Sequence, residues 1–157
     1  MTVRFTKGDG KPDSLTCIRD DGTRTWSPVG ATVGPEHDLA HYAVETTLAY
    51  RDAFLGMLAA GRDIADFGTK NGIKDVYPTE AIVAEHLVGL IQLSLRQPLT
   101  TVDIIDQFAA SLNNAGITAP DIEAMDIDRA RENYLALIDR WRSLSPGESM
   151  DLPFPTG

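Results

Sequence analysis

The sequence predicts an α+β fold, in which a small antiparallel sheet packs on about four α-helices. Two patterns lead to this prediction. Apolar and polar residues alternate, as they do in strands, within residues 1–30 and again within 148–154, whereas residues 35–144 carry apolar side chains at helical spacing. The chain has 157 residues, enough for one hydrophobic core. We therefore expect a single domain over residues 1–157.

Three short stretches predict the sheet. The run TVRF near the N-terminus alternates, and LTCIRDDGTRTWSPV contains two strand-like runs on either side of Asp21-Gly22. An Asp-Gly pair between strands favours a type I′ turn, in which both central residues have positive φ. In the tail ESMDLPF, the apolar residues Met150, Leu152 and Phe154 share one side, so we expect a last strand that returns to the N-terminal sheet.

The first two predicted helices follow the hairpin. Residues 36–60 are rich in apolar side chains until Gly61, which suits a helix C-cap, so they predict one long helix. A loop with one short turn around Ile64 comes next. A second helix is then predicted from Thr79 to about Arg96, because Pro98 disfavours its continuation.

Two further helices complete the predicted helical region. Thr100 and Asp103 have the spacing of a capping box, which predicts a third helix that stops at Gly116. Pro120 suits the first turn of a fourth helix or helix pair. The apolar stripe of that helix consists of Ile127, Ala130, Tyr134, Leu137, Ile138, Trp141 and Leu144.

Composition narrows the classes of partner. The net charge of −9 and the absence of any Lys and Arg cluster argue against nucleic acid as a partner. No apolar run reaches membrane-spanning length and the N-terminus lacks the apolar core of a signal peptide, so we expect a cytoplasmic protein without a membrane partner. The acidic run 120–132 predicts a solvated helix face. Cys17, the single cysteine, predicts a buried structural thiol.

Two of the three histidines lie in the stretch PEHDLAHYAVE, residues 35–45. His37 and His41 are four residues apart and share a helical sector that is otherwise apolar, so we expect both to face inward. Glu45 borders that sector. On the second helix, Glu85 falls on a polar strip with Gln92 and Arg96, whereas His86 falls among Ile82, Leu90 and Leu93.

A histidine pair at this spacing suits one divalent metal ion, because the two side chains stand one turn apart on the same helix face. Zinc is favoured, and nickel, manganese and iron also accept imidazole with carboxylate. Glu45 lies about 12 Å along the axis from His37, so it would orient His41 or serve a second ion. The remaining ligand would come from the second helix, where burial favours His86 and ligand chemistry favours Glu85.

The pattern HDLAH resembles the HExxH helix of zinc metallopeptidases. The resemblance implies that His37 and His41 bind zinc, that Asp38 is the general base and that Glu85 is the third ligand. It departs from the family at Asp38, because Asp is one carbon shorter than Glu and would hold the attacking water differently.

A wider resemblance extends to about residue 95. The segments RDDGTRTW, HDLAHYAVETTL and EAIVAEHLVGL are similar to those of a group of uncharacterised bacterial proteins. This resemblance implies a shared fold and a shared site at His37, Asp38, His41, Glu45 and Glu85, and it implies no activity.

Two interpretations of the histidines follow. In the first, the chain is a metal-binding domain whose site is centred on His37 and His41 and hydrolyses a small molecule or peptide. In the second, the three histidines are core or homodimer-interface residues, held by Asp38, Glu45 and backbone carbonyls, in a protein without catalytic activity. We expect Glu45 to lie within reach of the histidine pair, with His86 entering from the second helix and Glu85 outside.

Overall fold

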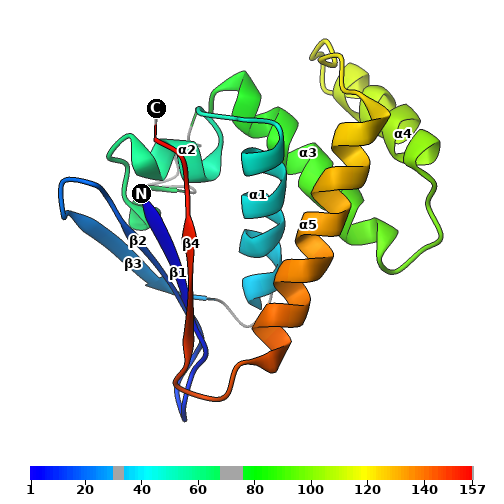
Figure 1. The fold of residues 1–157 in the computed structure, drawn as a ribbon. Helices are drawn as coiled ribbons and strands as arrows, with labels where there is room; N and C mark the ends of the chain where they lie inside the picture. The colour runs from blue at the N-terminus through cyan, green and yellow to red at the C-terminus, as the bar shows by residue number, and fades with distance from the viewer. Residues whose placement is uncertain (30–33, 68–75, 157) are drawn as a thin grey trace.

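The computed structural model of this protein describes residues 1–29, 34–67 and 76–156. Its four-stranded antiparallel sheet has the order β3-β2-β1-β4 and packs beside a group of helices (Figure 1). The strands are β1 (Thr2–Thr6), β2 (Ser14–Ile18), β3 (Arg24–Pro28) and β4 (Ser149–Pro153). The C-terminal strand β4 pairs with β1, with Val3 opposite Leu152. The predicted α+β class and the return of the tail to the N-terminal sheet are confirmed.

One face of the sheet forms part of the core. Apolar side chains on alternate positions of β1, β2 and β4 are buried. The intervening side chains point to the other face, where Arg4 and Asp151, 43% and 46% exposed, form a bidentate ion pair at 2.7 Å. The buried set comprises Val3, Phe5, Leu15, Cys17, Met150 and Leu152, with Phe154 just beyond β4. The predicted burial of Cys17 and of the apolar tail residues is therefore confirmed.

The hairpin between β2 and β3 has a longer turn than predicted. Ile18 pairs with Arg24, so five residues separate the strands. Gly22 has φ +85°, but Ala49 is the single non-glycine residue with positive φ among the described residues, so Asp21 does not adopt the type I′ conformation. The carboxylate of Asp21 instead accepts the backbone N–H of Thr23 at 2.9 Å, which stabilises an Asx-type turn.

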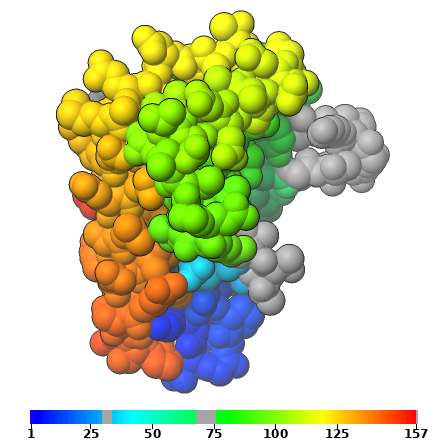
Figure 2. All heavy atoms as spheres, turned by 90° about the vertical axis from the view of Figure 1, so that its right-hand side faces the viewer, coloured from blue at the N-terminus to red at the C-terminus, as the bar shows by residue number. Residues whose placement is uncertain are grey.

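Helix α1 lies at the centre of the helical group. It spans Gly34–Thr47 and packs against α3 and α5. In the space-filling view only a small part of it (cyan) is visible between the orange α5 and the green helices (Figure 2). A hydrogen bond of 2.6 Å from the Tyr42 hydroxyl to the Pro153 carbonyl joins α1 to β4. The central position agrees with a helix that is apolar on several sides.

The prediction of one helix over residues 36–60 is wrong. The structure divides this segment into α1 and a short helix α2 (Phe54–Ala59), and Ala49 between them has φ +53°. The buried Glu45 carboxylate accepts the N–H groups of Leu55 and Gly56 in the first turn of α2, so an internal acidic side chain stabilises the break. A Cβ on Gly56 would lie 2.0 Å from the Arg51 carbonyl oxygen, so this close approach of the connection requires glycine.

The later helices agree closely with the predictions. They are α3 (Thr79–Ser94), α4 (Thr101–Asn114) and α5 (Ala124–Ser143), and a 3₁₀ turn spans Ile64–Asp66. The capping box is confirmed, since the Thr100 hydroxyl accepts from the Asp103 N–H at 3.1 Å and the Asp103 carboxylate accepts from the Thr100 N–H at 2.8 Å. Helix α5 begins at Ala124 after the N-cap Glu123, so the prediction that Pro120 lies in its first turn is wrong, whereas its predicted apolar stripe from Ile127 to Trp141 is buried.

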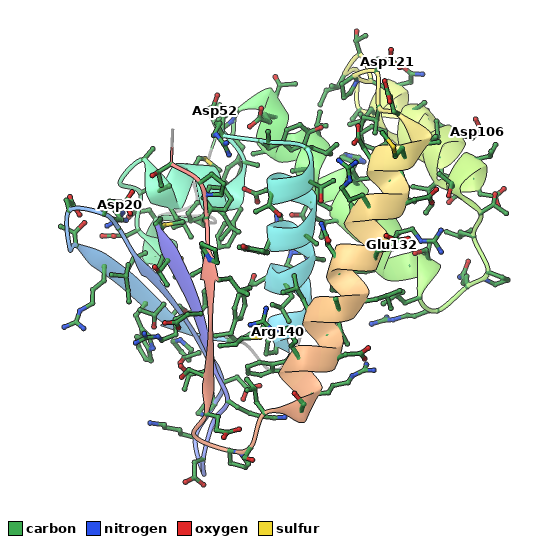
Figure 3. The ribbon with its side chains drawn as sticks, viewed as in Figure 1. Asp20, Asp52, Asp106, Asp121, Glu132 and Arg140 are labelled. Carbon is green, nitrogen blue, oxygen red and sulfur yellow. The ribbon has the colours of Figure 1, made fainter. Side chains whose placement is uncertain are left out.

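The acidic residues near the start of α5 lie on the surface. Asp121 and Glu132 are exposed, and Asp121, like Asp106 on α4, projects away from the body of the molecule (Figure 3). The predicted solvated helix face is confirmed. None of the helices in the described part of the chain is both long enough and apolar enough to cross a lipid bilayer.

Candidate metal centre

Two histidines of α1 and one glutamate of α3 converge on a point between these helices. The Nε2 atoms of His37 and His41 lie 3.2 Å apart. Glu85 reaches both rings, with Oε2 3.0 Å from His41 Nε2 and Oε1 3.7 Å from His37 Nε2. We call these three residues the His37–His41–Glu85 cluster. One ligand atom from each lies within 4.8 Å of the others, as a shared ion requires.

The other ring nitrogen of each histidine has a defined partner. His41 Nδ1 lies 3.1 Å from Glu45 Oε1, and His37 Nδ1 lies 3.1 Å from Gln92 Oε1. Both partners are acceptors, so both Nδ1 atoms carry a proton. In the neutral form of each ring the lone pair is therefore on Nε2, the atom that faces the cluster.

His41 is a buried cation when no metal is present. Burial by itself lowers the pKa of His41, but hydrogen bonds to Glu45 and Glu85 outweigh burial and raise it to about 9. The same hydrogen bond from His41 lowers the pKa of Glu85. The pKa of Glu45 is raised because burial disfavours its charge more than His41 stabilises it. The side chain of Glu85 is 60% exposed, whereas those of His41 and Glu45 are 5% and 0% exposed.

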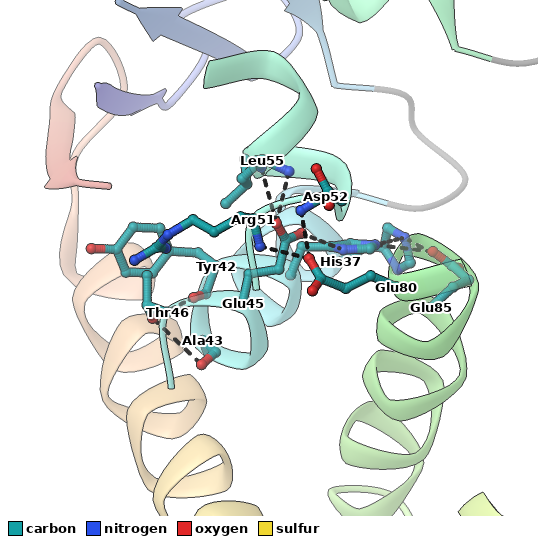
Figure 4. A network of polar contacts seen from close by, with 12 residues as sticks. His37, Tyr42, Ala43, Glu45, Thr46, Arg51, Asp52, Leu55, Glu80 and Glu85 are labelled. Carbon is teal, nitrogen blue, oxygen red and sulfur yellow. Dashed lines mark hydrogen bonds and ion pairs between the residues drawn. The ribbon is translucent and has the colours of Figure 1, made fainter. Parts of the chain in front are cut away.

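Glu45 joins the cluster to α2. One carboxylate oxygen contacts His41, and the other accepts from the N–H groups of Leu55 at 2.9 Å and Gly56 at 3.2 Å (Figure 4). The predicted proximity of Glu45 to His41 agrees with this geometry. The contact of Glu45 with the first turn of α2 is not predicted by the sequence, because it depends on the break between α1 and α2. On the far side of the same connection, Glu80 of α3 accepts the N–H groups of Arg51 and Asp52.

His86 and Glu85 take positions opposite to the expected ones. His86 Nδ1 lies 3.0 Å from Ser111 Oγ on α4, and His86 is not part of the cluster. The polar strip of α3 faces α1, because Glu85 and Gln92 both contact histidines there. The expectation that His86 meets the histidine pair while Glu85 lies outside is therefore wrong, because Glu85 contacts both rings and His86 contacts α4. The reason is that α3 has apolar residues on nearly every side, and packing selected a rotation that periodicity did not indicate.

Asp38 lies beside the cluster at the wall of a pocket. Its carboxylate is half-buried, and burial raises its pKa. Among the described residues, no hydrogen bond to this carboxylate is present, in contrast to Glu45 and Glu85. The pocket has a volume of about 450 Å³, and His37, His41, Glu85 and His86 also line it. An ion at the cluster would thus be reached from an open cavity with a carboxylate at its side.

Gln92 is the site residue that sequence reasoning did not assign. Periodicity places it on the same strip as Glu85 and indicates no role for it. Its position seven residues after Glu85, two turns along one face, was the available signal, because a residue there lies opposite α1 whenever Glu85 does. Its contact with His37 across 55 positions of sequence could only be seen in the folded chain.

The homodimer that the sequence analysis allows stays a prediction.

Comparisons with models of known protein families, with curated proteins and with solved structures found no match. The chemistry of the His37–His41–Glu85 cluster and its pocket is therefore the basis for any functional assignment.

Proposed function

We propose that this protein binds one divalent metal ion, with zinc favoured, through His37 Nε2, His41 Nε2 and the Glu85 carboxylate. A tetrahedral zinc ion with ligands at about 2.0–2.1 Å separates its ligand atoms by roughly 3.3–3.4 Å. His41 Nε2 lies 3.2 Å from His37 Nε2 and 3.0 Å from Glu85 Oε2, and His37 Nε2 lies 3.7 Å from the other Glu85 oxygen, all near this value. This agreement is the observation that carries the proposal. Nickel, manganese and iron remain alternatives, since the same ligand types suit them.

The partners of the two Nδ1 atoms support the proposal. Histidines that bind metals usually donate the other ring N–H to a carboxylate or carbonyl, which holds the ring orientation and increases its basicity. Glu45 serves His41 in this way and Gln92 serves His37. Asp38 and Glu45 are therefore assigned outside the ligand set, Glu45 as the residue that orients His41.

Hydrolysis is the activity that suits such a site. Three protein ligands leave a coordination position for water, and the pocket provides access to it. A bound zinc ion supplies Lewis-acid activation of that water. Asp38 lines the same pocket, and burial raises its pKa, which favours a role as general base. The substrate would be a small molecule or a peptide end that enters the pocket.

One observation favours a second candidate, a purely structural network. Both ring nitrogens of His41 have carboxylate partners without any metal, and no buried polar side-chain atom lacks a hydrogen bond among the described residues. In this alternative the His41 cation between Glu45 and Glu85 only joins α1, α2 and α3. Such a network requires neither metal nor substrate.

Zinc titration of protein purified without an affinity tag separates the two candidates. We expect one equivalent of zinc by elemental analysis or calorimetry, and a higher melting temperature with zinc than with EDTA. Glu85→Gln should weaken zinc binding at least tenfold. Glu80→Gln is the matched control, because Glu80 lies on the same helix but contacts the α1–α2 connection instead.

The structural alternative has a different signature. It predicts that Glu85→Gln lowers the melting temperature equally in zinc and in EDTA. A wild-type melting curve that responds to neither zinc nor chelator would reject the metal-binding proposal.

A further inference from the structure

The pocket beside the cluster has one polar side and one apolar side. Successive turns of α3 contribute to both, because Ala81 and Ile82 line it one turn before Glu85 and His86. The apolar side continues through Phe54 and Met57 of α2 and through Phe67 and Tyr77. The polar side continues through His37, Asp38 and His41 of α1. A ligand that fills this volume must match both sides.

The apolar side is largely aromatic. The rings of Phe54 and Phe67 meet edge to face with centroids 4.9 Å apart, and Tyr77 stacks on Phe67 at 6.0 Å with an angle of 14° between planes. The Phe54 ring also lies 5.4 Å from His41, so the aromatic wall extends up to the cluster. Aromatic walls of this kind favour flat apolar groups, which gain burial and ring contacts together.

The polar side presents the carboxylates of Asp38 and Glu85, and the His41 cation beside them is already paired with Glu45 and Glu85. Asp38 and Glu85 are acceptors, and none of the described lining residues is Lys or Arg. The guanidinium of Arg62 lies 4.4 Å from the Phe67 ring centroid but is outside the lining. A head that donates hydrogen bonds therefore suits the described part of this end, where an anionic head would meet two carboxylates.

His86 adds a further acceptor to the same side. The Ser111 hydroxyl donates to the Phe108 carbonyl at 2.9 Å, so it accepts from His86 Nδ1–H, and neutral His86 carries its lone pair on Nε2. No hydrogen bond to this Nε2 is present among the described residues. Since no buried side-chain nitrogen there lacks a partner, Nε2 is open to solvent.

We propose that this pocket binds a small molecule with a flat, apolar, aromatic body and an uncharged hydrogen-bond-donating head, such as an aryl alcohol. The body lies against Phe54, Phe67 and Ile82, and the head points to Asp38, Glu85 and His86. The inference rests on the proposed function for the identity of the site, because the head lies beside the His37–His41–Glu85 cluster, and it describes the ligand of the metal-free site. The contacts of the aromatic body with the apolar side require no ion.

A matched pair of probes tests this ligand class. 2-Naphthol and 2-naphthoate share one ring body, but at pH 7 the first has a neutral donating head and the second an anionic head. In calorimetric titrations of the EDTA-treated protein, we expect 2-naphthol to bind at least tenfold more tightly than 2-naphthoate. Equal affinity of the two probes, or no binding of 2-naphthol, would overturn the proposal.

Substitutions of Ala81 and Ala110 test whether 2-naphthol binds in this pocket. Ala81→Phe, or the smaller Ala81→Leu if the first unfolds, places a side chain in the pocket and should weaken 2-naphthol binding at least tenfold. Ala110→Phe on the exposed face of α4 is the matched control and should bind as the wild type does. Unchanged binding in both Ala81 variants would show that the probe sits elsewhere and would refute the inference.

The zinc titration distinguishes this failure from failure of the metal. If 2-naphthol binds in EDTA and Ala81→Phe prevents it while zinc does not bind, the ligand class stands and the metal proposal falls. If one equivalent of zinc binds but Ala81→Phe leaves the affinity for 2-naphthol unchanged, the metal proposal stands and the ligand class is refuted.

Discussion

Replacing Glu45 tests the residue on which the site and the α1–α2 connection both depend. Its carboxylate is 0% exposed and makes three contacts, at 3.1 Å with His41 Nδ1, 2.9 Å with Leu55 N–H and 3.2 Å with Gly56 N–H. Glu45→Ala removes all three acceptor contacts. It leaves two N–H groups of α2 without a partner and a buried imidazolium with Glu85 alone.

The cost follows from these contacts. Loss of a helix N-terminal acceptor costs about 0.5–2 kcal/mol, and removal of one partner of a buried ion pair costs about 3–5 kcal/mol. Because His41 retains Glu85 and can lose its proton, we expect Glu45→Ala to lower the free energy of unfolding by about 3–5 kcal/mol rather than by the sum. Glu45→Gln keeps an oxygen that accepts from α2 and should cost about 1–3 kcal/mol.

Urea denaturation of the metal-free protein, followed by circular dichroism, measures both variants. Glu80→Ala is the matched control, because Glu80 accepts two N–H groups of the same connection at an exposed position, and we expect a loss of about 1 kcal/mol or less. A Glu45→Ala protein within about 0.5 kcal/mol of the wild type would refute the dual role assigned to Glu45.

Three other predictions follow from the structure. Deletion of residues 148–157 removes β4 and the buried Met150, Leu152 and Phe154, whose burial contributes about 1.5–3 kcal/mol each. The truncated chain should therefore show no cooperative melting transition, and an unchanged melting transition would contradict the pairing of β4 with β1. The pKa of His41 is raised from 6.5 to about 9, so the contribution of its charge to the stability of the metal-free protein is fully present below pH 6.5 and is lost as pH rises through 9. The melting temperature of the wild type should therefore fall over this interval more than that of His41→Gln, and an equal change in the two proteins would argue against the ion-pair network. Burial raises the pKa of the Cys17 thiol to about 12, so a thiol reagent at pH 8 should modify Cys17 only after denaturation, and rapid modification of the folded protein would show that the sheet face opens.

The sequence by itself determined the local features of this protein. Alternation placed the strands, including the C-terminal strand, because a side chain every second residue defines one face of a sheet. The Thr100–Asp103 capping box could also be predicted from the sequence, because its two residues are only three positions apart and contact each other within one helical turn. The spacing of His37 and His41 likewise predicted that they share a helix face, and their rings lie with centroids 4.7 Å apart.

Only the tertiary structure decided which groups meet across elements. The segment 36–60 has helical composition throughout, and its break depends on Glu45 reaching back to Leu55 and Gly56, a contact that exists only once the chain has turned. Helix α3 is apolar on most sides, so several rotations bury comparable area. Packing buried Val83, Leu87, Val88 and Ile91 and thereby pointed Glu85 and Gln92 at α1 and His86 at α4. Periodicity indicates which faces can be buried, and where nearly all of them can, the neighbouring elements select the one that is.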